Sequence, residues 1–152
     1  MGIVNLTPDS FSDGGKFSSA TAAVAQAQAL VAAGADVLDL GAESTRPGHA
    51  PVSAAEEIAR LLPALQAIRD ALPEVPVSID TYKAEVAAAA IAAGADILND
   101  IWGGLYEAAE EISPMAQVAA RTGAPLILMH NRTEPVADEA KIEEALDTLA
   151  EE

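Results

Sequence analysis

A repeated alternation of short apolar runs with longer alanine-rich segments constrains the fold of this chain more than any other feature. The segment Ala32–Asp39 (AAGADVLD) resembles Ala92–Asn99 (AAGADILN), which begins 60 residues later, and Ala119–Leu128 is a weaker third copy. A spacing of about 30 residues is the length of one strand–helix unit. The alternation therefore predicts a mainly parallel sheet whose strands are joined by right-handed helical crossovers.

The expected elements follow from these runs. Strands are predicted at Met1–Val4, Val37–Leu40, Val77–Asp80, Ile97–Asn99 and Leu126–Met129. Helices are predicted at Ala20–Ala33, Ser53–Leu72, Lys83–Ala93, Ser113–Thr122 and Ala137–Glu152. The strands are almost continuously apolar, which is typical of strands that are buried on both faces.

Residues near the predicted helix ends agree with these limits. Ser53 and Glu56 have the spacing of a capping box at a helix start. Pro63 lies inside the second predicted helix, so a kink or a break is expected near it. Glycines follow three of the helices, where a left-handed residue commonly ends a helix: Gly34, Gly94 and Gly123.

Five strand–helix units fit two architectures. One is a five-stranded doubly wound sheet, and the other is the first five-eighths of a (β/α)8 TIM barrel, which needs about 250 residues. Polar side chains end every predicted strand, and these include Asn5, Asp39, Asp80, Asn99 and His130. Such a ring is where TIM barrels carry their active sites. We therefore predict that residues 1–152 form a single, partial TIM-barrel domain.

Charge and composition exclude several classes of protein. The net charge is −16, from 24 acidic and 8 basic residues, which argues against partners such as nucleic acid or an anionic membrane. The absence of cysteine excludes a disulfide framework and thiolate chemistry. No apolar run reaches the roughly 18 residues of a membrane span, and no basic segment precedes an apolar one at the start. We expect a cytoplasmic protein.

The connector Asn5–Gly15 (NLTPDSFSDGG) carries an unusual density of functional groups. Pro8 prevents the strand ladder from continuing, and Gly14 and Gly15 allow the backbone to turn. Four motifs, beginning with this connector, are similar in sequence and order to those of dihydropteroate synthases: Asn5–Gly15, Ser44–Gly48 (STRPG), Ser78–Thr81 (SIDT) and Asn99–Ile101 (NDI). The resemblance runs from Met1 to about Arg132 and implies the same TIM barrel.

The resemblance implies a reaction of folate biosynthesis that sulfonamides inhibit. In it, p-aminobenzoate displaces diphosphate from 6-hydroxymethyl-7,8-dihydropterin diphosphate, which gives 7,8-dihydropteroate. The implied cofactor is Mg²⁺, the partners are these small molecules, and the assembly is a homodimer. Catalysis would rest on Asn5, Arg46 and Asp80.

Residues of the pterin and diphosphate site follow from the matched motifs. Asn5 would help to hold Mg²⁺ and the diphosphate, since an amide oxygen is a neutral ligand for a hard cation. Arg46 would neutralise the leaving diphosphate, because its planar guanidinium matches phosphate oxygens. Contacts with the pterin and its diphosphate are implied for Thr45, Arg46, Asp80, Asn99 and Met129.

The p-aminobenzoate site is implied on two loops. Phe11 would form an apolar wall, Asp13 would interact with Arg46 when the loops close, and Pro47 would border the pocket. Closing such loops excludes water from a reactive cation. Lys83, in the first turn of a predicted helix, is expected at the surface, because a cation there opposes the helix dipole.

The family pattern continues through three more strand–helix units, so catalysis by these 152 residues alone is an open question. A partial barrel has two unpaired sheet edges, so a chain that exists alone is predicted to self-associate through them or to adopt a rearranged fold. Two rival functions remain open. One is a pterin-binding methyltransferase, against which the Asn5–Gly15 motif argues, and the other is a non-catalytic half-barrel fragment.

Overall fold

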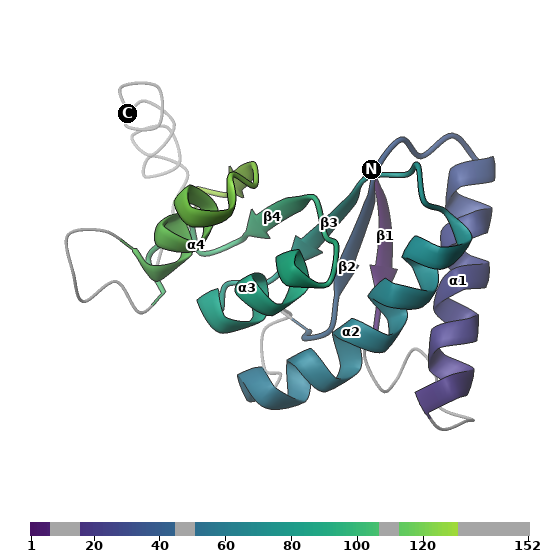
Figure 1. Ribbon diagram of the computed structural model, residues 1–152, viewed down its shortest axis with the longest axis horizontal. Helices are drawn as coiled ribbons and strands as arrows, with labels where there is room; N and C mark the ends of the chain where they lie inside the picture. Colours follow the sequence, from purple (N-terminus) through teal and green to yellow (C-terminus); the bar gives the residue numbers. More distant parts are fainter. Residues whose placement is uncertain (7–15, 45–50, 107–112, 131–152) are drawn as a thin grey trace, which may run out of the picture.

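The computed structural model describes residues 1–6, 16–44, 51–106 and 113–130 (Figure 1). Strands and helices alternate through these residues. The strands are β1 (Gly2–Asn5), β2 (Leu38–Gly41), β3 (Val77–Asp80), β4 (Ile97–Asp100) and β5 (Leu126–Leu128). The helices are α1 (Lys16–Ala32), α2 (Ala54–Ala71), α3 (Ala84–Ala92) and α4 (Pro114–Thr122). The final predicted helix, Ala137–Glu152, lies outside the described residues.

All neighbouring strands are parallel, and their order in the sheet is β1-β2-β3-β4-β5. A doubly wound sheet reverses its strand order at a switch point and places helices on both faces. Here the order follows the sequence, and the four described helices lie along one side of the strands (Figure 1). This arrangement is an arc of an α/β barrel, which confirms the partial TIM barrel and excludes the doubly wound alternative.

The main hydrophobic core lies between the strands and the helices. Val4, Leu40 and Ile79 are fully buried and pack with apolar side chains of α1, α2 and α3. Leu98 of β4 packs in a second cluster with Met115 of α4. Because side chains alternate across a strand, the remaining positions of each strand face the inside of the arc.

Burial on that inner face varies across the sheet. All four residues of β2 are buried, as are the first three of β3, which fits the prediction of strands buried on both faces. That prediction is wrong at the two outer strands, since Ile3 is 59% exposed and Ile127 is 41% exposed. Among the described residues, β1 and β5 each have only one neighbouring strand, so their inner side chains are covered least.

The helices differ from the prediction in two respects. Helix α1 begins at Lys16, four residues before the predicted start. Of the kink or break predicted near Pro63, the break does not occur, because α2 continues through this residue. Its buried residues on both sides of the proline, including Leu61 and Leu65, pack into the core, and this packing outweighs the lost backbone hydrogen bond.

Caps at other helix ends match the prediction. Ser53 Oγ accepts a hydrogen bond from Glu56 N at 3.3 Å, although the Glu56 carboxylate pairs with Arg60 rather than completing a capping box. Gly34 and Gly123 adopt φ of 99° and 73°, as expected for glycines that end helices. Within the described segments, no helix combines the length and the apolar composition needed to cross a membrane.

Candidate functional site

A row of aligned residues crosses the carboxyl ends of the first four strands, and its members on β1, β3 and β4 are polar. In the sheet register, Asn5 aligns with Gly41, Gly41 with Asp80, and Asp80 with Asn99. Aligned residues of parallel strands project to the same face. The structure thus brings Asn5, Asp80 and Asn99 together at one edge of the arc.

The absence of a side chain at Gly41 makes room for the Asp80 carboxylate. A Cβ at position 41 would lie 3.2 Å from Asp80 Oδ2, which is closer than most such contacts in proteins. Burial, and after it the negative charges of Asp39, Glu57, Asp100 and Glu43, together raise the pKa of Asp80 to about 6. Asp80 therefore changes its charge close to neutral pH.

Asp39 belongs to the same inner face, although the motifs did not single it out. It is 6% exposed, and its Oδ2 accepts a hydrogen bond of 3.1 Å from Asn99 Nδ2. The internal repeat could have indicated this pair, because Asp39 and Asn99 are the last residues of its first two copies.

Three buried polar atoms on this face have no hydrogen-bond partner in the described part of the chain: Asp39 Oδ1, Ser78 Oγ and Asp80 Oδ1. Buried polar atoms in folded proteins are almost always paired, so a cluster of unpaired ones needs an explanation. Ser78 aligns with Asp39 in the register, and Asp80 aligns with Gly41. The arrangement can accept hydrogen bonds from a ligand rich in N–H groups.

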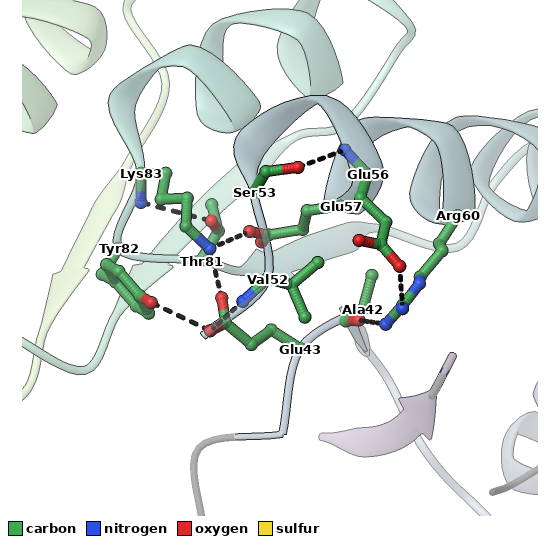
Figure 2. Close-up of polar contacts among 10 residues, drawn as sticks. All are labelled: Ala42, Glu43, Val52, Ser53, Glu56, Glu57, Arg60, Thr81, Tyr82 and Lys83. Atoms are coloured by element: carbon green, nitrogen blue, oxygen red, sulfur yellow. Dashed lines mark hydrogen bonds and ion pairs between the residues drawn. The ribbon is translucent and has the colours of Figure 1, made fainter. Parts of the chain in front are cut away.

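Lys83, Glu43 and Glu57 form a buried ion-pair cluster (Figure 2), and the negative charges of both glutamates act on Asp80. Lys83 Nζ contacts the Glu43 carboxylate and lies 2.6 Å from Glu57 Oε2. The side chains of Lys83, Glu43 and Glu57 are only 9%, 8% and 2% exposed. The prediction of a surface lysine is therefore wrong, because two carboxylates stabilise the cation at the start of α3 against the helix dipole.

The charges of the cluster are mutually stabilised. Burial alone would lower the pKa of Lys83, but the hydrogen bonds and negative charges of Glu43 and Glu57 outweigh it and raise that pKa. Burial alone would raise the pKa of Glu43, but hydrogen bonds from Lys83, Val52 and Tyr82 outweigh it and lower that pKa. Lys83 and Glu43 therefore stay charged at neutral pH.

Glu43 also joins two parts of the chain that flank residues 45–50. Its Oε1 accepts hydrogen bonds from Val52 N at 3.1 Å and from the Tyr82 hydroxyl at 3.0 Å (Figure 2). Arg60 Nη1 donates to the carbonyl oxygen of Ala42 at 3.3 Å. The residues before this segment are thereby held to the residue Val52 after it, to α2 and to the connection between β3 and α3.

Asp100 organises the turn after β4. It is fully buried, and its carboxylate accepts hydrogen bonds of 2.8 Å from both Trp102 N and Gly104 N. Its carbonyl oxygen accepts a hydrogen bond of 3.0 Å from Met129 N, which places this turn beside the end of β5. Met129 itself is 44% exposed. Asp100 therefore has a structural role that the sequence did not reveal.

The predicted site residues divide into two groups. Asn5, Asp80, Asn99 and Met129 lie at the carboxyl ends of the strands or just beyond them. The loop residues are outside the described part of the chain, and their roles stay predictions: Phe11, Asp13, Thr45, Arg46 and Pro47.

Known proteins that resemble this chain in sequence and in structure include dihydropteroate synthases. A dihydropteroate synthase of Clostridium beijerinckii is 52% identical over 132 residues, which are 87% of this chain and 47% of that protein. The dihydropteroate synthase of Clostridium difficile, solved in the presence of pteroic acid, superposes with a TM-score of 0.81 at 42% identity and covers 97% of this chain and 54% of that one. This chain therefore spans about half the length of such relatives.

A second solved structure agrees. The dihydropteroate synthase of Anaplasma phagocytophilum with bound 6-hydroxymethylpterin-monophosphate has a TM-score of 0.82 and 42% identity, covering 99% of this chain and 57% of that one. The family model described as "Pterin binding enzyme" matches residues 1–152. With its partial barrel and its polar row at the strand ends, the chain belongs to the family of pterin-binding enzymes.

Proposed function

We propose that this chain is the N-terminal part of a dihydropteroate synthase. The observation that carries the proposal is the pairing of Asp80 and Asn99 in register on the inner face, beside buried acceptor atoms that have no partner among the described residues. A pterin ring presents several N–H groups along one edge, and carboxylate and amide oxygens accept them. The likeness to dihydropteroate synthases that were solved with pteroic acid and with a pterin monophosphate supports this ligand class.

In the proposed reaction, the amine nitrogen of p-aminobenzoate attacks the methylene carbon of the pterin diphosphate. The bond from that carbon to the diphosphate oxygen breaks, diphosphate leaves, and the attacking amine loses a proton. Asp80 and Asn99 hold the ring that carries developing positive charge. Above its pKa of about 6, Asp80 is a carboxylate and stabilises that charge.

Loop residues complete the proposed site on the basis of the motifs. Thr45 and Arg46 contact the diphosphate, and Arg46 neutralises it as it leaves. Phe11, Asp13 and Pro47 form the p-aminobenzoate site. Met129 packs against the pterin, which suits its partly exposed thioether beyond β5.

Magnesium fits the residues present if the substrate supplies most of its ligands. Within the described residues, no three His, Cys, Asp or Glu side chains gather where they could hold a metal ion. Mg²⁺ is commonly bound by one or two protein oxygens together with substrate phosphates and water. The amide oxygen of Asn5, exposed at the end of β1, would be the protein ligand. The ion would supply positive charge to the departing diphosphate.

The test is diphosphate release that depends on p-aminobenzoate, measured together with pterin binding. Asp80→Ala is expected to abolish pterin binding, and Asp36→Ala, an exposed aspartate before β2, is the control expected to leave it unchanged. Retained binding by Asp80→Ala would remove Asp80 from the site.

The same assay separates the proposed function from both rival functions. A pterin-binding methyltransferase would bind the pterin but release no diphosphate in response to p-aminobenzoate. A non-catalytic half barrel would bind the pterin without turnover. We also propose that the parent enzyme is a cytoplasmic homodimer that sulfonamides inhibit by occupying the p-aminobenzoate site, which sedimentation and competition binding would test.

A further inference from the structure

Asp39 is a buried carboxylate on the inner face for which the proposed reaction has no use. Its Oδ2 accepts the hydrogen bond from Asn99 Nδ2 at 3.1 Å, and its Oδ1 is buried without a partner in the described segments. A carboxylate with a purely structural role is normally saturated with hydrogen bonds, because leaving an oxygen unpaired in the interior is costly. Asp39 therefore stands out from the fully paired Glu43 and Asp100 nearby.

The contact determines how the Asn99 amide is turned. An ionised carboxylate only accepts hydrogen bonds, so the atom of Asn99 that faces Asp39 has to be the nitrogen. The carbonyl oxygen of Asn99 then lies on the other side of the amide group, where it can accept a hydrogen bond from another donor. Without Asp39, the amide could rotate by half a turn and present its nitrogen there instead, which would repel a ligand N–H.

We propose that Asp39 is a positioning residue of the pterin site, which holds the Asn99 amide with its oxygen toward the N–H groups of the ligand. The inference rests on the proposed function. It adds a residue that acts through Asn99, and it selects ligands whose edge carries hydrogen-bond donors at this position.

The test is a double-mutant cycle read by the binding of 6-hydroxymethylpterin, a probe without diphosphate. Asp39→Ala removes the acceptor and is expected to weaken binding roughly tenfold, the size typical for the loss of a hydrogen bond with a charged group. Asp39→Asn keeps an acceptor oxygen of the same shape, so it is expected to stay within about threefold of the wild type. Asn99→Ala is expected to weaken binding by about as much as Asp39→Ala.

The decisive variant combines the two alanines. If Asp39 acts only through Asn99, adding Asp39→Ala to Asn99→Ala costs no further affinity. Additive losses, or equal losses in Asp39→Asn and Asp39→Ala, would overturn the inference. Urea unfolding of each variant separates a lost fold from a lost contact. If the alanine variant unfolds, Asp39→Leu, which has nearly the same shape and no acceptor, takes its place in the cycle with the same expected loss.

Failure of the proposed function has a different signature. A wild-type chain that does not bind the pterin probe refutes both the proposed function of this chain and the inference that rests on it. A wild-type chain that binds the probe, with variants that show no coupling between positions 39 and 99, refutes the inference alone.

Discussion

Replacing Lys83 by methionine should destabilise this protein far more than the substitution of any exposed charged residue. The variant Lys83→Met keeps the length of the side chain but leaves the carboxylates of Glu43 and Glu57, 8% and 2% exposed, without their cation. Removing one partner of a buried ion pair typically costs about 3–5 kcal/mol. We expect a loss of this size in the free energy of unfolding at pH 8, since two carboxylates would remain in place of a triad.

The pH dependence gives the sharper test. In the wild type, the pKa of Glu43 is below its ordinary value of 4.5, so its contribution to stability is present above that value and is lost as the pH falls through the lower value. In Lys83→Met, burial would instead raise the carboxylate pKa values, and protonation would relieve the repulsion. The difference in stability between the two proteins should therefore shrink as the pH falls from 8 to 4.

Urea unfolding followed by the fluorescence of Trp102, the single tryptophan, measures these energies. Lys83→Arg keeps the charge and should recover most of the loss. Arg121→Met, which removes an exposed cation from the last turn of α4, is the matched control and should cost less than about 1 kcal/mol. A loss below about 1 kcal/mol for Lys83→Met at pH 8, or one that does not change with pH, would refute the reasoning.

Three further predictions concern the polar row and its surroundings. Pterin affinity should fall as the pH drops below about 6, because Asp80 becomes protonated. Burial raises the pKa of Asp80 from 3.8, so its ionised form destabilises the fold, and Asp80→Asn should be more stable than the wild type at pH 8 but not at pH 4. Urea titrations at both pH values would show this difference. Gly41→Ala should displace the Asp80 carboxylate and weaken pterin binding severalfold, while the free energy of unfolding changes by less than about 1 kcal/mol. Unchanged affinity in a binding titration would contradict the close approach of the new Cβ to Asp80. Asp100→Ala should lower the free energy of unfolding by about 2–4 kcal/mol and shift the emission of Trp102, because two backbone N–H groups lose their acceptor. An unaltered emission spectrum would count against the structural role of Asp100 in this turn.

The alternating pattern of the sequence was sufficient to predict most of the fold. Apolar runs and helix-ending glycines placed the strands within two residues, and the polar strand ends favoured the barrel over the doubly wound sheet. The common edge of Asn5, Asp80 and Asn99 followed from parallel strands alone, because their carboxyl ends meet.

Contacts between distant parts of the chain could not be predicted in this way. Lys83 was expected at the surface because only its own helix was considered, whereas its partners lie 40 and 26 residues earlier in the sequence. Of the kink or break expected near Pro63, the break did not occur, because the packing of a whole helix outweighs one local preference. Both differences arise from tertiary burial, which a local pattern does not contain.

The hydrogen bond between Asp39 and Asn99 has a consequence for how such a barrel can arise. The two residues end equivalent segments of an internal repeat, and their side chains differ only in whether one terminal atom is oxygen or nitrogen. A molecule assembled from copied units would begin with identical groups at these positions, and two aspartates would repel each other. One change of aspartate to asparagine turns that repulsion into a matched donor and acceptor, so a single substitution after duplication is enough to make the two copies cooperate.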